Sequence, residues 1–239
     1  MPSERIPIIW VTGASRGIGA AIARAFAATG AHVVLSGRNV QELDRNTRKI
    51  RLLDQNASFL KCDVTSEASV TRAYTSIVKR YHVVDVLVNN AGVTCFKSFG
   101  KTAVRDFDTI LATNLRGTFL CTKSVLPAMV KRRAGVIINI VSVAALTTFE
   151  NSSAYAAAKA GILAMSRGLR SEVRKKGVRV IDILPGAVET EMWHYAARKK
   201  YHEKMMQPED VAEVVVSAFR QSQRVLTEEI VIRPIEGDL

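Results

Sequence analysis

Short apolar runs alternate with longer amphipathic stretches along almost the whole chain. The apolar runs are rich in Val and Ile and have the length of buried strands, at 8–12, 33–36, 58–62, 84–88, 136–141 and 178–184. The stretches between them have helical length and spacing, at 19–28, 40–53, 68–81, 103–132 and 153–175. Buried strands separated by helices predict right-handed crossovers and a parallel sheet covered on both faces. A last run at 229–233 predicts a further strand at one edge.

No feature of the sequence marks a domain boundary. No linker rich in Pro, Gly or Ser, no repeat and no low-complexity tract divides the 239 residues, so we predict a single domain over 1–239. In a doubly wound sheet, ligands bind at the carboxyl ends of the strands, near the point where the strand order reverses. The residues that carry the chemistry should therefore follow the predicted strands directly.

Composition limits the class of protein and its compartment. Hydrophobic residues make up 48% and charged residues 23%, as in an ordinary globular protein. No apolar run reaches the roughly 18–20 residues that span a bilayer, and the N-terminus lacks the apolar stretch of a signal peptide. Three cysteines cannot all pair and show no metal-ligand spacing, so we expect a cytoplasmic protein without a metal site.

The net charge of +12 favours anionic partners, among them nucleic acids, acidic proteins and phosphorylated cofactors. The basic clusters are short, at 131–133, 174–176 and 198–200, and each could simply be a solvated helix end. No zinc spacing, stacking-aromatic motif or long basic tail supports nucleic-acid binding. We therefore expect neither a nucleic acid nor a membrane as a partner.

The first predicted strand leads directly into TGASRGIG at 12–19, and a helix follows at once. Glycines permit a tight turn and a close approach of the backbone to a pyrophosphate, and the helix N-terminus offers free N–H groups. The spacing G-x-x-x-G-x-G is a variant of the dinucleotide fingerprint, although three glycines could also serve the turn alone. The loop predicts nucleotide contacts from Gly13, Ser15, Arg16, Gly17, Ile18 and Gly19.

The end of the second predicted strand distinguishes between two cofactors. NAD-binding folds usually carry an acid about 20 residues beyond the glycine loop, bonded to the ribose 2′-hydroxyl. Here the strand ends in Leu-Ser-Gly-Arg38-Asn, without an acid. The guanidinium of Arg38 can bind a 2′-phosphate in bidentate fashion, and Arg16 can add a second positive charge. NADP(H) is favoured over NAD(H); the alternative is that both arginines are ordinary surface residues.

Tyr155 and Lys159 lie four positions apart on one face of a predicted helix. A free Tyr has a pKa of about 10, and we expect the ammonium of Lys159, with a positive nicotinamide, to lower it. Tyr155 would then be a general acid for ketone reduction and a base for the reverse reaction, and Lys159 could also bind the cofactor's ribose. A Y-x-x-x-K pair by itself is frequent, so other residues must support this interpretation.

Two further polar residues provide that support. Ser142 follows the strand 136–141 and could hold the substrate carbonyl oxygen beside the Tyr155 phenol. Asn114 lies inside a long predicted helix, where its amide needs a partner. A water bridged from Asn114 to Lys159 would open a proton route to solvent. Taken singly, Asn114 is also explained as an amide satisfied by helix packing.

Together these motifs resemble the short-chain dehydrogenase/reductase family over roughly residues 6–235. The matching features are T-G-x-x-x-G-x-G at 12–19, Asn-Asn-Ala-Gly at 89–92, Asn114, Ser142 and Tyr155-x-x-x-Lys159. The resemblance implies an α/β fold, a single Rossmann-type doubly wound domain with a mostly parallel seven-stranded sheet and helices on both faces. It also implies an Asn114-Ser142-Tyr155-Lys159 tetrad. Further cofactor contacts implied by it are Asp63 and Val64 at the adenine, Asn90, Ala91 and Gly92 along the cofactor, and Pro185, Gly186, Val188 and Thr190 at the nicotinamide.

Within the family, the chain is most similar to 3-oxoacyl-[acyl-carrier-protein] reductases and related carbonyl reductases. The resemblance implies that Arg133 and Lys176 hold an acidic carrier protein, although helix-end cations also occur for dipole reasons. Two features depart from the carrier-protein group: the ending at 230–239 lacks its Gly-Gly segment, and the loop at 146–151 is bulkier. A lid at 188–206 carries Met192, Trp193 and Tyr195, enough apolar surface to cover a substrate, and the basic cluster 198–200 could attract an acid.

We therefore expect reduction of a carbonyl, either a 3-oxoacyl thioester or a similar small ketone, by an NADPH-dependent enzyme. One alternative is an NADP-dependent dehydrogenase of a 3-hydroxy acid or secondary alcohol, since the sequence does not record the direction of flow. Another is a nucleotide-sensing protein without turnover, although such proteins usually lose the Tyr or the Lys. The long helices at 103–132 and 153–175 predict a homodimer or homotetramer.

Overall fold

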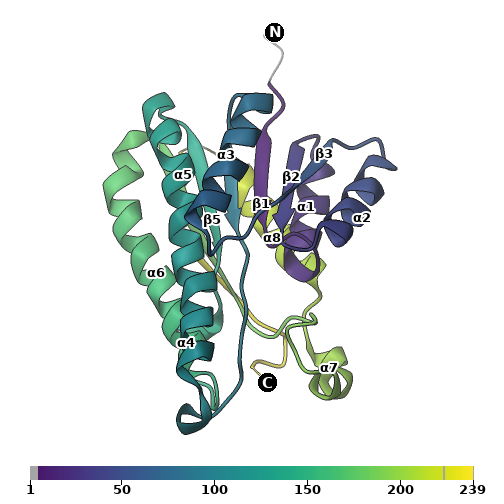
Figure 1. The fold of residues 1–239 in the computed structure, drawn as a ribbon, viewed down its shortest axis with the longest axis vertical. Coiled ribbons are helices and arrows are strands. Elements are labelled where there is room, and N and C mark those ends of the chain that lie inside the picture. The colour runs from purple at the N-terminus through teal and green to yellow at the C-terminus, as the bar shows by residue number, and fades with distance from the viewer. Residues whose placement is uncertain (1–4, 223, 239) are drawn as a thin grey trace.

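The computed structural model describes residues 5–222 and 224–238. Within this part of the chain one sheet of seven strands forms the centre of the molecule, in the order β3-β2-β1-β4-β5-β6-β7 (Figure 1). Every neighbouring pair of strands is parallel. The strands are β1 (Ile8–Thr12), β2 (His32–Gly37), β3 (Ala57–Lys61), β4 (Val86–Asn89), β5 (Gly135–Ile140), β6 (Val178–Pro185) and β7 (Glu229–Ile232).

The strand predictions are confirmed to within two residues at each end, and the last strand lies at an edge, paired with β6. Strand order reverses between β1 and β4, because the chain adds β2 and β3 on one side of β1 and later strands on the other. The loops after β1 and β4 therefore diverge at the carboxyl edge of the sheet, which is where a doubly wound fold binds its ligands.

Helices cover both faces of the sheet, as predicted. On one face α1 (Gly17–Ala27), α2 (Val40–Arg51) and α8 (Pro208–Arg220) pack on the strands through Ile22, Phe26, Leu43 and Val215. On the other face α3 (Glu67–Tyr81) and α5 (Gly117–Arg132) pack through residues that include Ile77, Val125 and Met129, with the end of α6 (Ser153–Val173) beside them. Both faces of the central strands are therefore shielded from solvent, which explains why these strands are continuous runs of Val and Ile.

Two helical predictions need correction. The stretch 103–132 is not one uniform helix: α4 (Val104–Ile110) passes through a π-helical turn (Leu111–Arg116) before α5 begins. Single π turns inside α-helices are frequent at functional sites, and this one contains Asn114. The second correction concerns the chain after β6, where no helix was predicted. There α7 (Tyr195–Tyr201) lies in the predicted lid, and α8 follows it. A capping box of Gln207 and Asp210 with a Pro at the helix start was a readable signal for α8.

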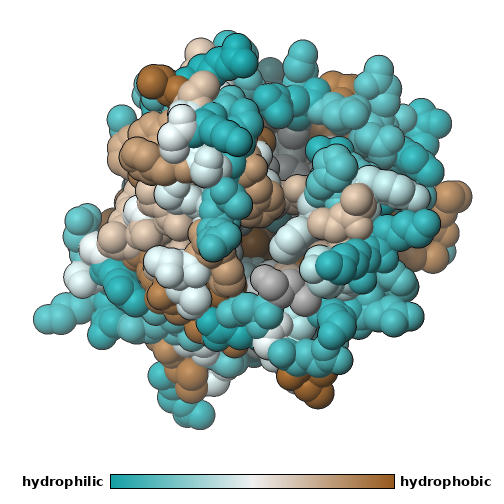
Figure 2. Space-filling model, turned by 90° about the horizontal axis from the view of Figure 1, so that it is seen from below, coloured by the Kyte–Doolittle hydropathy of each residue, from teal (hydrophilic) through white to brown (hydrophobic). Residues whose placement is uncertain are grey.

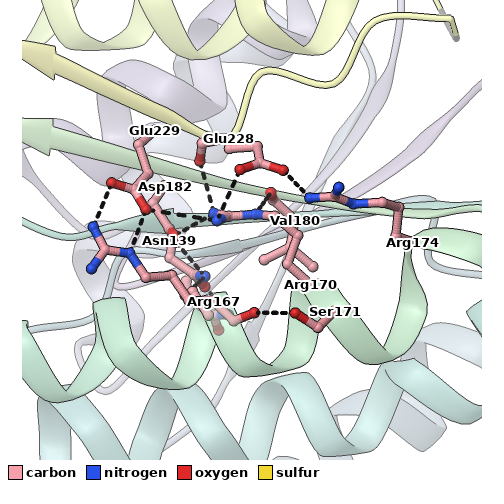
Figure 3. A network of polar contacts seen from close by, with 11 residues as sticks. Asn139, Arg167, Arg170, Ser171, Arg174, Val180, Asp182, Glu228 and Glu229 are labelled. Atoms are coloured by element: carbon pink, nitrogen blue, oxygen red, sulfur yellow. Dashed lines mark hydrogen bonds and ion pairs between the residues drawn. The ribbon is translucent and has the colours of Figure 1, made fainter.

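A buried polar network joins α6 to the last two strands (Figure 3). The guanidinium of Arg170 on α6 donates to the carboxylate of Asp182 on β6 at 2.7 Å and to the carbonyl of Glu228 at 2.9 Å. Asn139 on β5 also donates to Asp182, at 2.9 Å. Burial raises the pKa of Asp182, although hydrogen bonds from Asn139 and Ser166 and the charge of Arg170 oppose the shift. The network fixes the position of α6 on the sheet by directional contacts.

Candidate active site

A cavity of about 1170 Å³ lies at the carboxyl edge of the sheet, over the β1–β4 switch point. Its walls come from the loops after β1 to β6, from the start of α6 and from the segment before α7. Figure 2 looks onto this face of the molecule, which is hollowed near its centre. Of the predicted site residues, all line the cavity except Gly19 and Asn114.

The glycine loop lies against the loop that follows β4. Gly13 has a φ of +64°, and a Cβ there would lie 2.7 Å from the Cα of Ala91. Gly19 packs behind the loop, where a Cβ would lie 2.4 Å from Nδ2 of Asn90. That amide donates to the carbonyls of Thr12 at 3.0 Å and Gly13 at 3.1 Å. Asn90 therefore holds the loop in shape from behind, and Gly19 allows this close packing.

The first turn of α1 has the properties of an anion site. Its N-cap, Arg16, makes no side-chain capping bond, and the turn contains no acid. The N–H groups there are left for another acceptor, and the helix dipole favours a negative one. Ser15, Gly17 and Ile18 line the cavity at this point.

Arginines surround the neighbouring end of the cavity. Arg38 follows β2 directly, is exposed and lines the cavity, and its contact with a 2′-phosphate stays a prediction. Arg16 also lines the cavity, but its guanidinium pairs with the carboxylate of Glu191, which comes from the segment after β6. Arg45 is a further lining cation that the sequence reasoning missed. Its position in the second turn of α2, the helix that directly follows Arg38, was the available signal.

Asp63 also lines the cavity. Its Oδ1 accepts hydrogen bonds from the backbone N–H of Thr65 at 3.0 Å and from the Thr65 hydroxyl at 2.8 Å. Partial burial raises the pKa of Asp63, but the bonds from Thr65 and the charge of Arg38 outweigh that effect, and the pKa is lowered overall. Asp63 thus shapes the turn after β3 and stays ionised beside the cavity.

The amino end of α6 brings Tyr155 and Lys159 to the middle of the cavity, where Ser142 arrives from the end of β5. The ammonium of Lys159 donates to the carbonyl of Ile140 at 2.8 Å and lies 5.5 Å from the centroid of the Tyr155 ring. Burial lowers the pKa of Lys159 to about 8. These three side chains from two elements converge on one point, as the tetrad prediction requires.

The expected lowering of the Tyr155 pKa by Lys159 is wrong for the protein groups alone. Burial raises the pKa of the phenol to about 12, and a hydrogen bond with Ser142 opposes the rise only in part. Removal of the phenol from water disfavours the phenolate more strongly than the hydrogen bond with Ser142 favours it. Tyr155 is therefore held as a protonated phenol at neutral pH.

Asn114 is buried behind the cavity wall, inside the π-helical turn. Its Oδ1 accepts from the N–H of Val93 at 2.8 Å, and its Nδ2 donates to the carbonyl of Val93 at 2.9 Å. Each polar atom of the amide thus has a protein partner. This agrees with the second interpretation of Asn114 given above, an amide whose hydrogen bonds are satisfied within the protein. Through these two bonds Asn114 fixes the loop after β4.

Aromatic side chains form the other end of the cavity. Phe96, from the loop after β4, stacks on Trp193 with ring centroids 5.8 Å apart and lies 6.4 Å from the Tyr155 ring. Phe149 and Met192 complete this apolar wall. The sequence reasoning found the bulk of Phe149, Met192 and Trp193 but missed Phe96, which follows the family-like segment at 89–92 by four residues.

Arg133 and Lys176 lie away from this cavity. Arg133 ends α5 just before β5 begins, and Lys176 lies in the 3₁₀ turn (Arg174–Lys176) just before β6. Both are therefore at the amino edge of the sheet, whereas Ser142 follows its carboxyl edge. The guanidinium of Arg133 donates to the carbonyl of Lys175 at 2.9 Å, so the two basic clusters are joined. Within one subunit they do not flank the cavity.

Comparison with known proteins agrees with this geometry. The family model described as short chain dehydrogenase matches residues 7–201. A sepiapterin reductase of Chlorobaculum tepidum is 38% identical over 97% of this chain and 98% of its own length. An uncharacterised oxidoreductase of Staphylococcus saprophyticus is 34% identical over 94% of this chain and 96% of its own. The chain belongs to the short-chain dehydrogenase/reductase family of oxidoreductases.

Solved structures show the same architecture. A metagenomic short-chain oxidoreductase in complex with NADP has a TM-score of 0.85 at 32% identity, covering 95% of this chain and 96% of its own. An actinorhodin polyketide ketoreductase variant with NADPH has a TM-score of 0.90 at 29% identity, covering 98% of each chain. Among the described residues, no helix combines the length and apolar character that crossing a membrane requires.

Proposed function

We propose that this chain is an NADPH-dependent carbonyl reductase that converts a ketone to a secondary alcohol. The observation that carries the proposal is a single cavity that joins the half-buried Tyr155 and Ser142 and the buried Lys159 to an uncapped helix N-terminus and a group of arginines. Relatives of known function point the same way: one is a sepiapterin reductase, and the similar solved structures hold NADP and NADPH.

The residues present fit a dinucleotide with a 2′-phosphate. The glycine loop leaves no room for a Cβ at Gly13, and the start of α1 offers N–H groups to a pyrophosphate. Arg38 and Arg45 line the cavity where β2 ends, in the place where an NAD-binding protein usually carries an acid. A 2′-phosphate would bind these guanidinium groups through charge-assisted hydrogen bonds, with Arg16 as a third candidate.

When bound, NADPH supplies the hydride. Tyr155 donates its phenolic proton to the carbonyl oxygen of the substrate, because burial keeps this phenol protonated at neutral pH. The hydroxyl of Ser142 lies beside the phenol and orients the same oxygen. Lys159, fixed by the carbonyl of Ile140, places a positive charge next to Tyr155 and can bind the ribose.

The protonation state of Tyr155 at neutral pH suits the reduction of a carbonyl. Reduction needs the protonated phenol, which is the form that burial stabilises, whereas oxidation needs the phenolate. The position of Arg133 and Lys176 at the far edge of the sheet adds no support for a carrier-bound thioester. A small ketone is therefore the better substrate class.

The direct test is NADPH oxidation in the presence of small ketones, 3-oxo acids and acetoacetyl thioesters, carrier-bound and free, with each assay repeated with NADH. We expect turnover of small ketones with NADPH and weaker turnover with NADH. Turnover confined to the carrier-bound thioester would restore the carrier-protein interpretation. Binding of NADPH without reduction of any carbonyl compound would contradict the proposed activity.

We also propose that two copies associate through α4, α5 and α6. An apolar groove there is lined by residues that include Leu111, Leu115, Phe119 and Met165, and the Phe119 side chain is 47% exposed. A second copy of the same face would cover these side chains by two-fold symmetry. Gel filtration should show a multiple of the 26.2 kDa chain, and a 26.2 kDa species alone would contradict association.

A further inference from the structure

A row of polar side chains crosses three strands of the sheet just before its carboxyl edge. Asn89 on β4 is the lateral neighbour of Asn139 on β5, and Asn139 is the neighbour of Asp182 on β6. All three side chains are buried, and they lie on the face that α5 and α6 cover. Two residues earlier on the same strands and the same face, the corresponding row is entirely apolar and consists of Leu87, Ile137 and Val180. The sheet therefore changes from apolar to polar packing directly before its ligand-binding edge.

Hydrogen bonds join this polar row to α6 at two levels. The amide of Asn139 donates to one carboxylate oxygen of Asp182 at 2.9 Å and to the hydroxyl of Ser166 on α6 at 2.8 Å. One turn further along α6, the guanidinium of Arg170 donates to the other oxygen of Asp182 at 2.7 Å (Figure 3). The same guanidinium donates to two backbone carbonyls, at 3.1 and 2.9 Å. These bonds fix α6 along its own axis, because each of them requires a particular direction between donor and acceptor.

The buried ion pair of Arg170 and Asp182 is not the arrangement that stability alone favours. The side chain of Asp182 is fully buried, and that of Arg170 is 4% exposed. Removal of both charges from water costs free energy, and well-packed apolar residues at such positions often give a protein that is equally stable or more stable. The apolar row two residues earlier shows that this face of the sheet accepts such packing. The pair is therefore better explained by the position that it gives to α6.

The position of α6 matters because the same helix carries the reactive side chains. Arg170 and Lys159 are both buried residues of α6, about three turns apart. The ammonium of Lys159 donates to the carbonyl of Ile140, the residue that directly follows Asn139. The polar row thus holds the helix that carries Lys159 and also the strand end that accepts its hydrogen bond. A shift of α6 along the sheet would lengthen this contact and would move Tyr155 with it.

We propose that Arg170 and Asp182 are positioning residues, which place Lys159, and with it Tyr155, in the arrangement that carbonyl reduction requires. The inference rests on the proposed carbonyl reductase function. Neither Arg170 nor Asp182 lines the cavity, so the pair acts through Lys159 and touches neither substrate nor cofactor. Misplacement of a reacting group by about 1 Å can lower a rate by about 100-fold, so a small shift of α6 is enough.

The test replaces both charges at once by apolar side chains, Arg170→Met together with Asp182→Leu, since a single replacement would leave one buried charge without its main partner. We expect the urea unfolding midpoint of this double variant to equal or exceed that of the unmodified protein. Its kcat for a small ketone should fall by about 10- to 100-fold. Arg167→Met is the matched control, because Arg167 lies on the same helix and pairs with Glu229 at an exposed position, and it should leave kcat unchanged. An unchanged kcat in the double variant would overturn the proposal.

A double-mutant cycle separates positioning from a general loosening of the fold. If the pair acts through Lys159, the same double replacement made in Lys159→Met should lower kcat by less than about twofold. A loss of the same factor in both backgrounds would show a merely structural role and overturn the proposal. If the double variant does not fold, Arg170→Lys takes its place, because it keeps the charge beside Asp182 and replaces the planar fork by a point donor. We expect this variant to lose about three- to tenfold in kcat, and an unchanged kcat would count equally against the proposal.

NADPH affinity, measured by the fluorescence of the bound cofactor, tests the inference without turnover. Lys159 can bind the cofactor's ribose, so its displacement in the double variant should weaken NADPH binding severalfold, and only where Lys159 is present. Such a result in a protein that reduces no carbonyl compound would refute the proposed activity and retain the positioning role. Reduction of ketones by the unmodified protein, with losses in kcat and NADPH affinity that are independent of Lys159, would refute the positioning role alone.

Discussion

The two ends of the cavity are built from different parts of the chain. At the basic end, backbone groups at Gly13 and the start of α1 are combined with Arg38 directly after β2 and with Arg45 on α2. At the aromatic end, Phe96, Glu150 and Trp193 come from three irregular segments far apart in sequence. The end built from backbone groups suits the cofactor, which members of a family share. The end built from loop side chains can change from one chain to another, and with it the substrate.

Tyr155 lies where the two ends meet, and its replacement has the largest expected effect. In Tyr155→Phe the ring and its packing remain and only the phenolic proton is lost. We expect kcat to fall by about 100- to 10,000-fold, the usual contribution of general acid catalysis. NADPH affinity, measured by the fluorescence of the bound cofactor, should stay unchanged. Activity retained by this variant would show that the proton comes from another group.

The second prediction concerns Lys159, which lies beside Tyr155 between the two ends, and its effect on the free energy of unfolding. Burial lowers the pKa of Lys159 from 10.5 to about 8, so its charge opposes folding below pH 8 and this penalty disappears as the pH rises toward 10.5. Relative to Lys159→Met, the wild-type protein should therefore gain on the order of 3 kcal/mol between these pH values. Urea unfolding of both proteins at pH 7 and pH 10 measures this gain. A constant difference would mean that Lys159 is neutral or hydrated at pH 7.

Arg38→Asp tests the basic end. The change removes charge-assisted hydrogen bonds to a 2′-phosphate and adds repulsion, so the NADPH-to-NADH ratio of kcat/KM should fall by about 10- to 100-fold. Arg48→Asp is the matched control, because Arg48 is an exposed residue of the same helix region, paired with Asp44, and does not line the cavity. If Arg38→Asp and Arg48→Asp behave alike, the 2′-phosphate is bound elsewhere.

The smallest effect is expected at the contact between the glycine loop and the segment after β6. Glu191 pairs with Arg16 at an exposed position, where ion pairs contribute little. Glu191→Gln frees Arg16 for the cofactor and should raise NADPH affinity by about two- to fivefold, with no change for NADH. Titration with both cofactors checks this, and an equal change for both would exclude competition for Arg16.

More residues of the basic end than of the aromatic end could be predicted from the sequence, and the reason is physical. Gly13 and Arg38 could be placed because a loop at a strand–helix junction has a fixed geometry. Phe96 could not, because its position depends on contacts between loops such as that of Lys97 with Asn151. For the protein groups alone, the pKa of Tyr155 is raised where a lowering was predicted, because burial of a side chain is a property of the packed molecule.

The helices show the same difference between features set by local sequence and features set by tertiary contacts. Strands and most helices follow from the alternation of apolar runs, which depends on local spacing. The π-helical turn at Asn114 does not, because it accompanies a tertiary pair of hydrogen bonds with Val93. α8 was predictable in principle, since Gln207, Pro208 and Asp210 form a helix start that can be read in the sequence.

The most direct test of the central claim is the reduction of a small ketone by the unmodified protein, followed by NADPH consumption and by chromatography of the alcohol. The account predicts one alcohol formed for each NADPH consumed, and a clear preference for NADPH over NADH. Formation of no alcohol from this ketone or from any of the other carbonyl compounds, by a protein that binds NADPH, would contradict it.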